Sequence, residues 1–278
     1  MLIAQLSDLH VRPRGELASR IIDTNMLVER ALLTLAAMRP VPDVVVISGD
    51  ITESGRPEEY RMAVTLLRRY LTMPVFVVPG NHDRRENFRT GLADMPGVTS
   101  DEPFVQYVVE DYPIRLVMLD SVVAEAGHGL LDGGRLDFLD RSLSAAPDRP
   151  TILVLHHPPM LTGSVGMDRI HLRDTAALGE VLARHNQVER ILTGHHHRAV
   201  VGRLGGAIVL VAPAVVHQSW LDLTPVGLDA MVLEPPAFLL HQLQPDGGIA
   251  SHTAYVERFP GPFPFQVDDD YPGRPAKV

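Results

Sequence analysis

The sequence predicts an α/β protein, because short apolar runs typical of buried strands alternate with segments of helical periodicity. Several of these runs end directly at a histidine, an aspartate or a Gly-Asp or Gly-Asn pair, an ending that packing alone does not explain. The runs are Leu2–Leu6, Val44–Ile47, Val75–Val78, Ile152–Leu155 and Arg190–Leu192. Since loops at strand ends carry function in α/β folds, we expect these polar side chains to share one site.

Two helices are expected between the first three strands. Apolar residues recur at helical spacing over 24–35, and Pro40 follows this pattern. In the second segment, 57–70, Pro57 stands at the first helical position and acidic residues follow in the first turn, which favours a helix start.

The rest of the chain continues the alternation of strands and helices. The elements expected there are paired strands at Phe104–Val109 and Arg115–Leu119, a short helix capped by Asp132, a helix from Leu172 to His185, a strand at Ala207–Ala212, and a hairpin of Phe238–Leu243 with Ser251–Val256.

Composition narrows the class of protein. The 278 residues carry a formal net charge of −9, and Lys and Arg form no cluster. A surface for large nucleic acids is therefore not expected. The sequence begins without a basic segment or an apolar run long enough for a signal or a membrane span, so we expect a cytoplasmic protein without membrane contact.

The absence of cysteine limits the chemistry further. Without cysteine there are no disulfides, thiolate metal ligands or thiol nucleophiles. A metal site in this chain must use His, Asp, Asn, Glu or water, which suits Mn, Fe, Co or Zn. Two such ions about 3.5–4 Å apart can clamp the attacking and leaving oxygens of a phosphoryl displacement. Asp50 is a natural bridge between them, since a carboxylate has two oxygens.

Five short segments carry these donor residues, in this order along the chain: Asp8-x-His10, Gly49-Asp50, Gly80-Asn81-His82-Asp83, His156 and Gly194-His195-x-His197. Together they resemble the signature of the calcineurin-like metallophosphoesterase superfamily. Further stretches resemble its bacterial class III cyclic nucleotide phosphodiesterases and, more closely, its glycerophosphodiesterase branch. These stretches are Arg14–Glu16, Ser54–Tyr60, His156–Pro159 and Val216–Gln218.

The resemblance implies a fold and a domain plan. The fold would be a four-layer α/β/β/α sandwich with a small C-terminal cap. Residues 1–215 would form the catalytic core, and residues 216–278 a cap or dimerisation region with a tail that packs back on the core. The apolar stretch Ala230–Leu240 suits a contact between subunits, so a homo-oligomer is expected.

The resemblance also implies two divalent metal ions, drawn from Mn, Fe, Zn or Co. The first would be held by Asp8, His10 and His197. The second would be held by Asn81, His156 and His195, and Asp50 would bridge the two. A hydroxide activated by the metals would attack phosphorus.

Four other residues receive roles in this scheme. His82 would be catalytic, near the leaving oxygen of the substrate, as a proton donor or an electrostatic stabiliser. Asp83 would orient the local turn or His82. His196 and His217 would contact substrate. His157 is expected to be structural, since His156 already points into the site.

The implied reaction is hydrolysis of small phosphodiesters, namely 3′,5′-cyclic nucleotides, glycerophosphodiesters or both. A phosphomonoesterase with the same site is the first alternative, which a comparison of ester types would decide. A protein-binding scaffold is the second, and it would be indifferent to loss of metal. Arg14 and Arg56 are candidates to meet phosphate, although an exposed arginine is usually just solvated.

Overall fold

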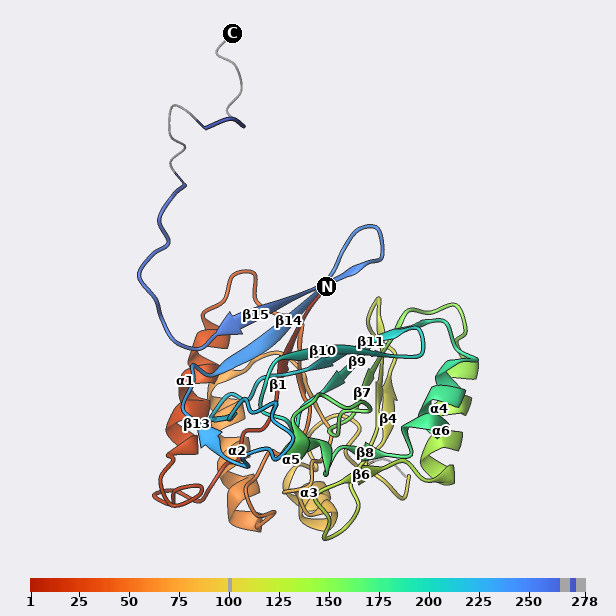
Figure 1. Cartoon of the computed structure of the whole chain (residues 1–278), viewed down its shortest axis with the longest axis horizontal. Helices are drawn as coiled ribbons and strands as arrows, with labels where there is room; N and C mark the ends of the chain where they lie inside the picture. Colours follow the sequence, from red (N-terminus) through yellow and green to blue (C-terminus); the bar gives the residue numbers. More distant parts are fainter. Residues whose placement is uncertain (100–101, 266–270, 274–278) are drawn as a thin grey trace.

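The computed structural model describes residues 1–99, 102–265 and 271–273. Two β-sheets pack against each other, and helices cover the outer faces (Figure 1). One large core cluster contains side chains from both sheets, among them Val45 and Ile152. The chain therefore forms the predicted α/β/β/α sandwich.

The first sheet has the strand order β15-β14-β1-β2-β3. Strands β1 to β3 run parallel, and β14 pairs antiparallel with β1 and with β15. Their bounds are β1 Leu2–Leu6, β2 Val44–Ile47, β3 Val75–Val77, β14 Ala237–Leu243 and β15 Ile249–Tyr255. The predicted hairpin near the C-terminus is confirmed, and it extends the sheet that carries the first donor residues.

The second sheet has the order β10-β11-β9-β7-β5-β4, with β5, β7, β9 and β11 parallel. Its strands are β4 Tyr107–Val109, β5 Arg115–Met118, β7 Thr151–Val154, β9 Val188–Thr193, β10 Val200–Leu204 and β11 Ala207–Val211. The antiparallel pairing of β4 with β5 confirms the prediction for this stretch.

The parallel strands form because their side chains are buried on both faces. All four residues of β2 are Val or Ile and are buried, and β7 is buried throughout. Near-continuous runs of β-branched and aliphatic residues are typical of parallel strands covered on both sides. The helices α1 (Thr24–Ala36), α2 (Pro57–Tyr70) and α3 (Arg85–Gly91) lie beside the first sheet, and α4 (Gly133–Ser144) and α6 (Thr175–Leu182) beside the second (Figure 1).

Helix starts follow the expected chemistry. The Asp23 side chain accepts a hydrogen bond from the backbone N–H of Met26, and Asp132 accepts one from Arg135, each at 3.0 Å. Such caps satisfy donors that the first helical turn leaves unpaired. The predicted helix start at Asp132 is confirmed.

The prediction of one helix from Leu172 to His185 is wrong at its start. Residues Leu172–Arg173 form the short strand β8, which pairs with β6 (Gly129–Leu130), and a single helical turn, α5 (Val165–Asp168), precedes it. Leu172 is fully buried and its N–H donates to the Pro158 carbonyl. Tertiary pairing therefore overrides the helical periodicity there, and the helix begins only after Asp174.

The segment after residue 215 divides into two parts. Residues 216–236 contain only the short strands β12 (Gln218–Ser219) and β13 (Met231–Val232), whereas β14 and β15 belong to the first sheet. Within the predicted contact stretch Ala230–Leu240, the part 237–240 is buried in the core of its own chain, because β14 pairs with β1. The division after residue 215 stays a prediction.

Residues 260–265 of the predicted tail are exposed and lead away from β15 (Figure 1). Residues 266–270 and 274–278 of the tail lie outside the described residues. Among the described residues, no helix has both the length and the apolar character needed to span a bilayer. The cytoplasmic location stays a prediction.

One buried histidine in β14 predicts how stability depends on pH. Burial, with the charges of Arg190 and His252 nearby, lowers the pKa of His241 to about 3. Below pH 6.5, where an unfolded histidine takes up a proton, the folded chain does not, so acid favours unfolding. The stability is therefore complete above pH 6.5 and falls as pH decreases toward 3.

His241→Gln removes this titration while keeping a neutral hydrogen-bonding side chain. Acidification from pH 6.5 to 5.0 should lower the free energy of unfolding of both proteins. The decrease should be smaller in the variant than in the native chain by roughly 1.5 kcal/mol. Urea unfolding at both pH values measures the difference. His252→Gln, on the exposed neighbouring position of β15, is the control and should behave like the native chain. Equal pH dependence in all three proteins would contradict the prediction.

Candidate metal centre

Loops that follow strands of both sheets bring the predicted donor residues together. The residues follow β1, β2, β3, β7 and β9. Four groups of donors each have their atoms within 4.8 Å of one another: Asp8, His10 and His197; Asp8, Asp50 and His156; His10, Asp50 and His82; and His156, His157 and His195. Six of the seven predicted metal ligands appear in these groups, and the seventh, Asn81, lies beside His156. Their roles as ligands stay predictions.

The backbone at these positions is bent into an uncommon conformation. Of nine non-glycine residues with positive φ in the described part of the chain, five are predicted ligands: Asp8 (55°), His10 (46°), Asp50 (49°), His195 (70°) and His197 (48°). A left-handed conformation costs on the order of 1 kcal/mol at a non-glycine residue. Such strain persists where the surrounding structure holds it, and it is concentrated at functional sites.

Two glycines let the loops approach closely. Gly49 has φ +98°, and a Cβ atom there would lie 2.3 Å from Nδ1 of His156. A Cβ atom at Gly80 would lie 2.2 Å from Oδ1 of Asp50. Both distances are far below van der Waals contact, so these positions admit only glycine.

The first donor group contains two imidazoles whose lone pairs face each other. His10 donates from Nδ1 to the Glu53 carboxylate (2.7 Å), and His197 donates from Nδ1 to the His217 carbonyl (3.0 Å). These bonds place the single proton of each neutral ring on Nδ1. The two Nε2 atoms nevertheless lie 3.0 Å apart, with Asp8 Oδ1 3.4 Å from that of His197. Only a cation between these acceptors, a proton or a metal ion, makes the arrangement favourable.

The donors predicted for the second metal ion, namely Asn81, His156 and His195, repeat this pattern. His156 donates from Nδ1 to the Ser48 carbonyl (2.8 Å), so its Nε2 is an acceptor. This Nε2 lies 3.1 Å from Oδ1 of Asn81 and 3.3 Å from Oδ2 of Asp50. His195 donates from Nε2 to the Ile170 carbonyl (3.0 Å), which leaves Nδ1 as the acceptor of its ring.

Asp50 lies between the donors predicted for the first metal ion and those predicted for the second. Its Oδ2 is 3.3 Å from Nε2 of His156 and 3.7 Å from Nε2 of His10, while Oδ1 accepts the N–H of His82 (2.8 Å). Burial disfavours a charged imidazole, but the Asp50 and Asp8 carboxylates outweigh it and raise the pKa of His156 to about 9. The site therefore attracts positive charge, and its nitrogen and oxygen donors fit two divalent metal ions that share Asp50.

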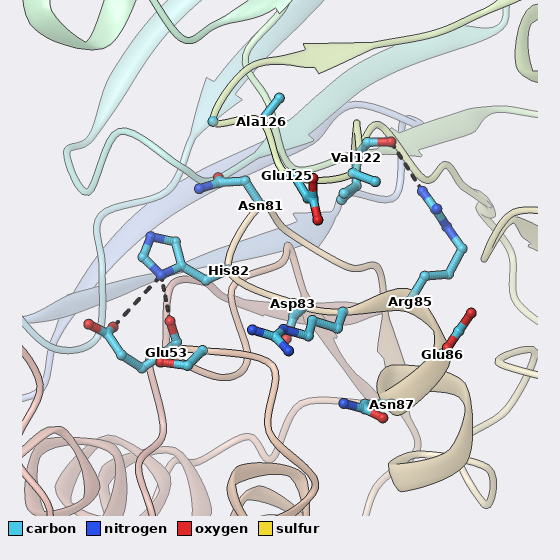
Figure 2. Close-up of a pocket in the computed structure, with 14 residues that line it drawn as sticks. Glu53, Asn81, His82, Asp83, Arg85, Glu86, Asn87, Val122, Glu125 and Ala126 are labelled. Carbon is cyan, nitrogen blue, oxygen red and sulfur yellow. Dashed lines mark hydrogen bonds and ion pairs between the residues drawn. The ribbon is translucent and has the colours of Figure 1, made fainter.

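His82 lies at the edge of the donor groups. Its side chain is 39% exposed, and Nδ1 donates to the Glu53 carbonyl (2.7 Å), with the Glu53 carboxylate 3.9 Å away. Figure 2 shows these two contacts as dashed lines. Burial opposes the imidazolium, but the charges of Asp50 and Glu53 raise the pKa of His82. The catalytic role of His82 stays a prediction.

Glu53 is a residue that the sequence reasoning missed. It holds His10 through its carboxylate and His82 through its carbonyl, so it orients one predicted ligand and the predicted catalytic histidine together. Its position three residues after Asp50, within the loop between β2 and α2, is the sequence feature that could have indicated this role.

Asp83 orients the turn that carries Asn81. Its buried carboxylate accepts hydrogen bonds from the N–H groups of Gly80, Ile51 and Thr52 and from the Tyr60 hydroxyl. Burial and the charge of Asp50 raise its pKa to about 6. The predicted role in the local turn is therefore met by direct bonds that join the loops after β2 and β3.

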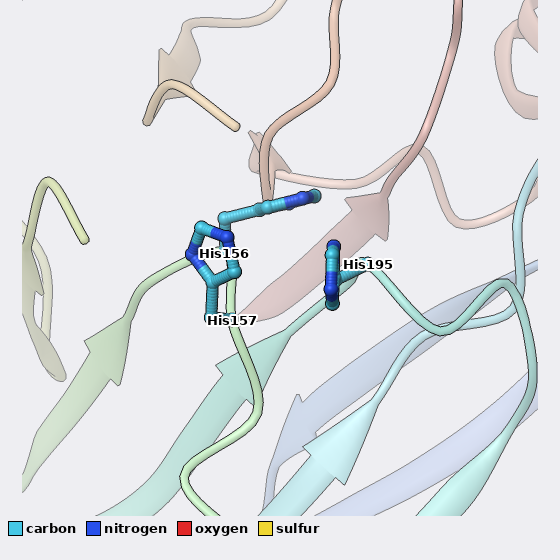
Figure 3. Close-up of side chains that lie close together, drawn as sticks. All are labelled: His156, His157 and His195. Carbon is cyan, nitrogen blue, oxygen red and sulfur yellow. The ribbon is translucent and has the colours of Figure 1, made fainter. Parts of the chain in front are cut away.

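Three further histidines surround the centre. Figure 3 shows His157 beside His156 and His195, with ring centroids 4.9 and 4.7 Å away. His217 lies 4.6 Å from His197 by ring centroids, and its carbonyl fixes the tautomer of that ring. Among the described side chains, Nε2 of His157, Nε2 of His196 and Nδ1 of His217 are buried without a protein partner. Substrate contact by His196 and His217 stays a prediction.

The two candidate arginines do not enter the centre. Arg14 is exposed. Arg56 binds Glu16 (2.6 Å) and Glu59 (3.4 Å) at the start of α2. Within the described part of the chain, neither contacts the donor groups, which agrees with solvated or structural roles.

A pocket of about 770 Å³ opens beside His82 and Asn81 (Figure 2). One wall is formed by residues 81–87 and the other by the loop 122–127. Arg85 joins the two walls: it binds Asp120 through two hydrogen bonds (2.7 and 3.1 Å) and donates to the Val122 carbonyl (3.1 Å). The pocket has room for a small substrate whose reacting atom lies at the donor groups.

The double-sheet sandwich and its buried donor groups define a metal-dependent hydrolase. Comparison with known proteins agrees: residues 1–199 match the calcineurin-like phosphoesterase family. The chain belongs to this family and is a metallophosphoesterase, as its motifs predict.

Relatives along most of the chain are phosphodiesterases by name. The chain is 34% identical to a probable glycerophosphodiester phosphodiesterase, GpdQ, of Arcobacter nitrofigilis, over 95% of this chain and 97% of that protein. It is 29% identical to the 3′,5′-cyclic adenosine monophosphate phosphodiesterase CpdA of Pseudomonas aeruginosa, over 98% and 95% of the two chains.

A solved structure supports the fold. A dimetal phosphatase from Danio rerio superimposes with a TM-score of 0.66 at 18% identity, covering 92% of this chain and 99% of that chain. At this identity the likeness shows the shared sandwich.

Removal of the shared carboxylate tests the arrangement. Asp50→Ala deletes a carboxylate that lies close to both His10 and His156, so we expect fewer than two Mn²⁺ ions per chain and loss of activity together. Metal content after dialysis and phosphodiester turnover measure the two effects. Two retained ions with near-normal turnover would contradict the shared role. Asp140→Ala, at a surface carboxylate that binds Arg184 and His185, is the matched control.

Proposed function

We propose that the protein hydrolyses small phosphodiesters at a centre of two divalent metal ions drawn from Mn, Fe, Zn or Co. Glycerophosphodiesters are the favoured substrates, and 3′,5′-cyclic nucleotides are the second candidate. The observation that carries the proposal is the position of His82, between donor groups that share Asp50 and a pocket of about 770 Å³.

The residues that would hold the ions follow from the donor groups. Those for the first are Asp8, His10 and His197, those for the second are Asn81, His156 and His195, and Asp50 would serve both. When bound, the ions would supply Lewis acidity that lowers the pKa of water and stabilises negative charge on the phosphate. The buried protein donors hold this charge in a fixed place before substrate arrives.

His82 supports the second half of the reaction. With Nδ1 bound to the Glu53 carbonyl, its Nε2 is the nitrogen that can hold a proton toward the pocket. An alcohol is a poor leaving group unless a proton or a positive charge reaches its oxygen as the bond to phosphorus breaks. His82 would supply that proton or charge, while His196 and His217 would contact the substrate.

The charges of the pocket favour a diester over a monoester. A monoester dianion calls for more cationic partners than a diester monoanion. Of the two guanidinium groups on the described lining, that of Arg85 is bound by Asp120, so only that of Arg84 is open to phosphate. A phosphomonoesterase therefore remains the weaker reading.

The lining also favours one diester class. Glu86 and Glu125 line the pocket and are exposed, and they suit a cationic amino alcohol better than a second phosphate. Among the described residues of the lining, no Phe, Tyr or Trp offers a face for stacking a purine. The glycerophosphodiesterase relative, at 34% identity, points in the same direction.

We also infer that the protein forms a homo-oligomer. Seven large apolar side chains are exposed between residues 220 and 233: Trp220, Leu221, Leu223, Val226, Leu228, Met231 and Leu233. Large exposed apolar patches are unusual on a monomer, and this short segment supplies many exposed apolar side chains. Light scattering at micromolar concentration should give a mass above 30.6 kDa, and a monomer would contradict the inference.

A substrate panel tests the proposed reaction. Metal-stripped protein refilled with Mn²⁺ should hydrolyse bis(p-nitrophenyl) phosphate faster than p-nitrophenyl phosphate, because the pocket favours a monoanion. Glycerophosphoethanolamine should be hydrolysed faster than cyclic AMP. Rates before and after refilling measure the dependence on metal. Faster hydrolysis of the monoester would make the protein a phosphatase, and faster hydrolysis of cyclic AMP would favour the second candidate.

His82→Ala separates catalysis from metal binding. We expect turnover of glycerophosphoethanolamine to fall about 10²–10⁴-fold with metal content unchanged, since His82 acts on the leaving oxygen. A nitrophenolate leaves without help, so the loss on bis(p-nitrophenyl) phosphate should be smaller. Loss of metal in this variant would make His82 a ligand, and an equal loss on both substrates would argue against a role at the leaving group.

A further inference from the structure

A chain of buried polar side chains lies beneath the metal centre and takes no part in the chemistry described above. At its middle is Gln5, the residue before the last of β1, with no exposed surface. Its Nε2 donates to Ser48 Oγ, just after β2, and to the carbonyl of Thr193, the last residue of β9, each at 2.9 Å. One amide therefore joins the first sheet to the second.

The direction of these hydrogen bonds is determined by their partners. The Thr193 carbonyl only accepts, so the amide nitrogen of Gln5 must face it, and both amide hydrogens are used. Oε1 of Gln5 then accepts from Nε2 of His241 (3.0 Å), and Nδ1 of His241 accepts from the Ser251 hydroxyl (2.8 Å). Every polar atom of the Gln5 amide has a partner, as a buried network requires.

The other end of this chain reaches the loops that carry the predicted ligands. Ser48 Oγ donates to Ser7 Oγ (2.9 Å), and Ser7 directly precedes Asp8. The Ser48 carbonyl accepts from Nδ1 of His156 (2.8 Å), and Ser48 stands two residues before Asp50. Thr193 leads in the same way into the loop of His195 to His197.

The predicted ligands come from both sheets. Four of them follow strands of the first sheet (Asp8, His10, Asp50 and Asn81), and three follow strands of the second (His156, His195 and His197). No backbone ladder joins the two sheets in the described chain. Single hydrogen bonds connect their loops, among them that from the Val215 N–H to the Ser7 carbonyl (3.3 Å) and those of the Gln5 amide. A displacement of about 1 Å is enough to spoil a metal or catalytic site.

We propose that Gln5 is a positioning residue for the metal centre. Its amide sets the distance between the loop after β2 and the loop after β9, which is the distance at which Asp50 faces both donor groups. His241 and Ser251 hold the amide in its orientation from the far side. This inference rests on the proposed two-metal function.

Gln5→Glu tests the proposal at almost constant side-chain volume. A carboxylate oxygen then faces the Thr193 carbonyl, so two acceptors meet and the connection between the sheets is lost. Titration of Mn²⁺ into the metal-stripped variant, followed by calorimetry, should show affinity weaker by about 10-fold. Turnover of bis(p-nitrophenyl) phosphate should recover to within a few-fold of the native rate at saturating Mn²⁺, since no group that touches substrate has changed.

Tyr107→Phe is the matched control. The Tyr107 hydroxyl donates to the Val77 carbonyl and accepts its N–H, both at 2.9 Å, and so joins β4 of the second sheet to β3 of the first. This variant loses a buried hydrogen-bonded connection between the sheets that is separate from the hydrogen bonds of Gln5. It should lower the midpoint of thermal unfolding while leaving the Mn²⁺ affinity within 2-fold of native.

Unchanged Mn²⁺ affinity in Gln5→Glu, with a loss of stability like that of Tyr107→Phe, would overturn the proposal and leave Gln5 a structural residue only. If Gln5→Glu does not fold, His241→Leu breaks the same chain beyond Gln5. It should weaken Mn²⁺ binding about 3-fold, and native affinity there would overturn the proposal equally. Fewer than two Mn²⁺ ions on the native chain would instead refute the two-metal function itself.

Discussion

At the ends of the strands, acceptor atoms of histidine and carboxylate side chains face one another. The rest of the structure depends on holding these acceptors together. Glu53 and the His217 carbonyl hold the protons of His10 and His197 on Nδ1, and the two Nε2 atoms are left 3.0 Å apart. Around His156 the same logic brings three acceptors together. Without positive charge these contacts are repulsive, and with it they form a binding site. The groups that bind the Nδ1–H of each imidazole therefore determine which nitrogen can bind a cation.

The fold meets this constraint by packing two sheets against each other so that the loops at the ends of their strands meet. This arrangement strains the backbone of the loops. Five of the predicted ligands have positive φ, and Gly49 and Gly80 tolerate no side chain. Strands such as β2, whose four residues are all buried Val or Ile, supply the apolar stabilisation that offsets it. Polar connections between the sheets lie both beside the centre and away from it. Gln5 makes one next to the centre, and Tyr107 makes another between β3 and β4.

Much of this arrangement could be predicted from the sequence, because each strand is a local pattern and each donor follows its strand directly. Local patterns do not reveal partners that lie far away in the chain. The first residues of the expected helix at Leu172 pair instead with β6, and the roles of Glu53 and Gln5 depend on contacts that no spacing shows. The expected contact stretch Ala230–Leu240 failed in part for the same reason, since its later residues pair with β1. The pocket could not be predicted from the sequence either, because it is formed by two loops that Arg85 joins through distant contacts.

The central claim is that two metal ions share one carboxylate, and electron paramagnetic resonance of the Mn²⁺-loaded protein tests it most directly. Two ions about 3.5–4 Å apart that share a ligand interact magnetically. A titration to two Mn²⁺ per chain should produce an exchange-coupled spectrum, and phosphodiesterase activity should rise with this signal. Two independent, uncoupled Mn²⁺ signals, or full activity with a single ion bound, would contradict a shared carboxylate.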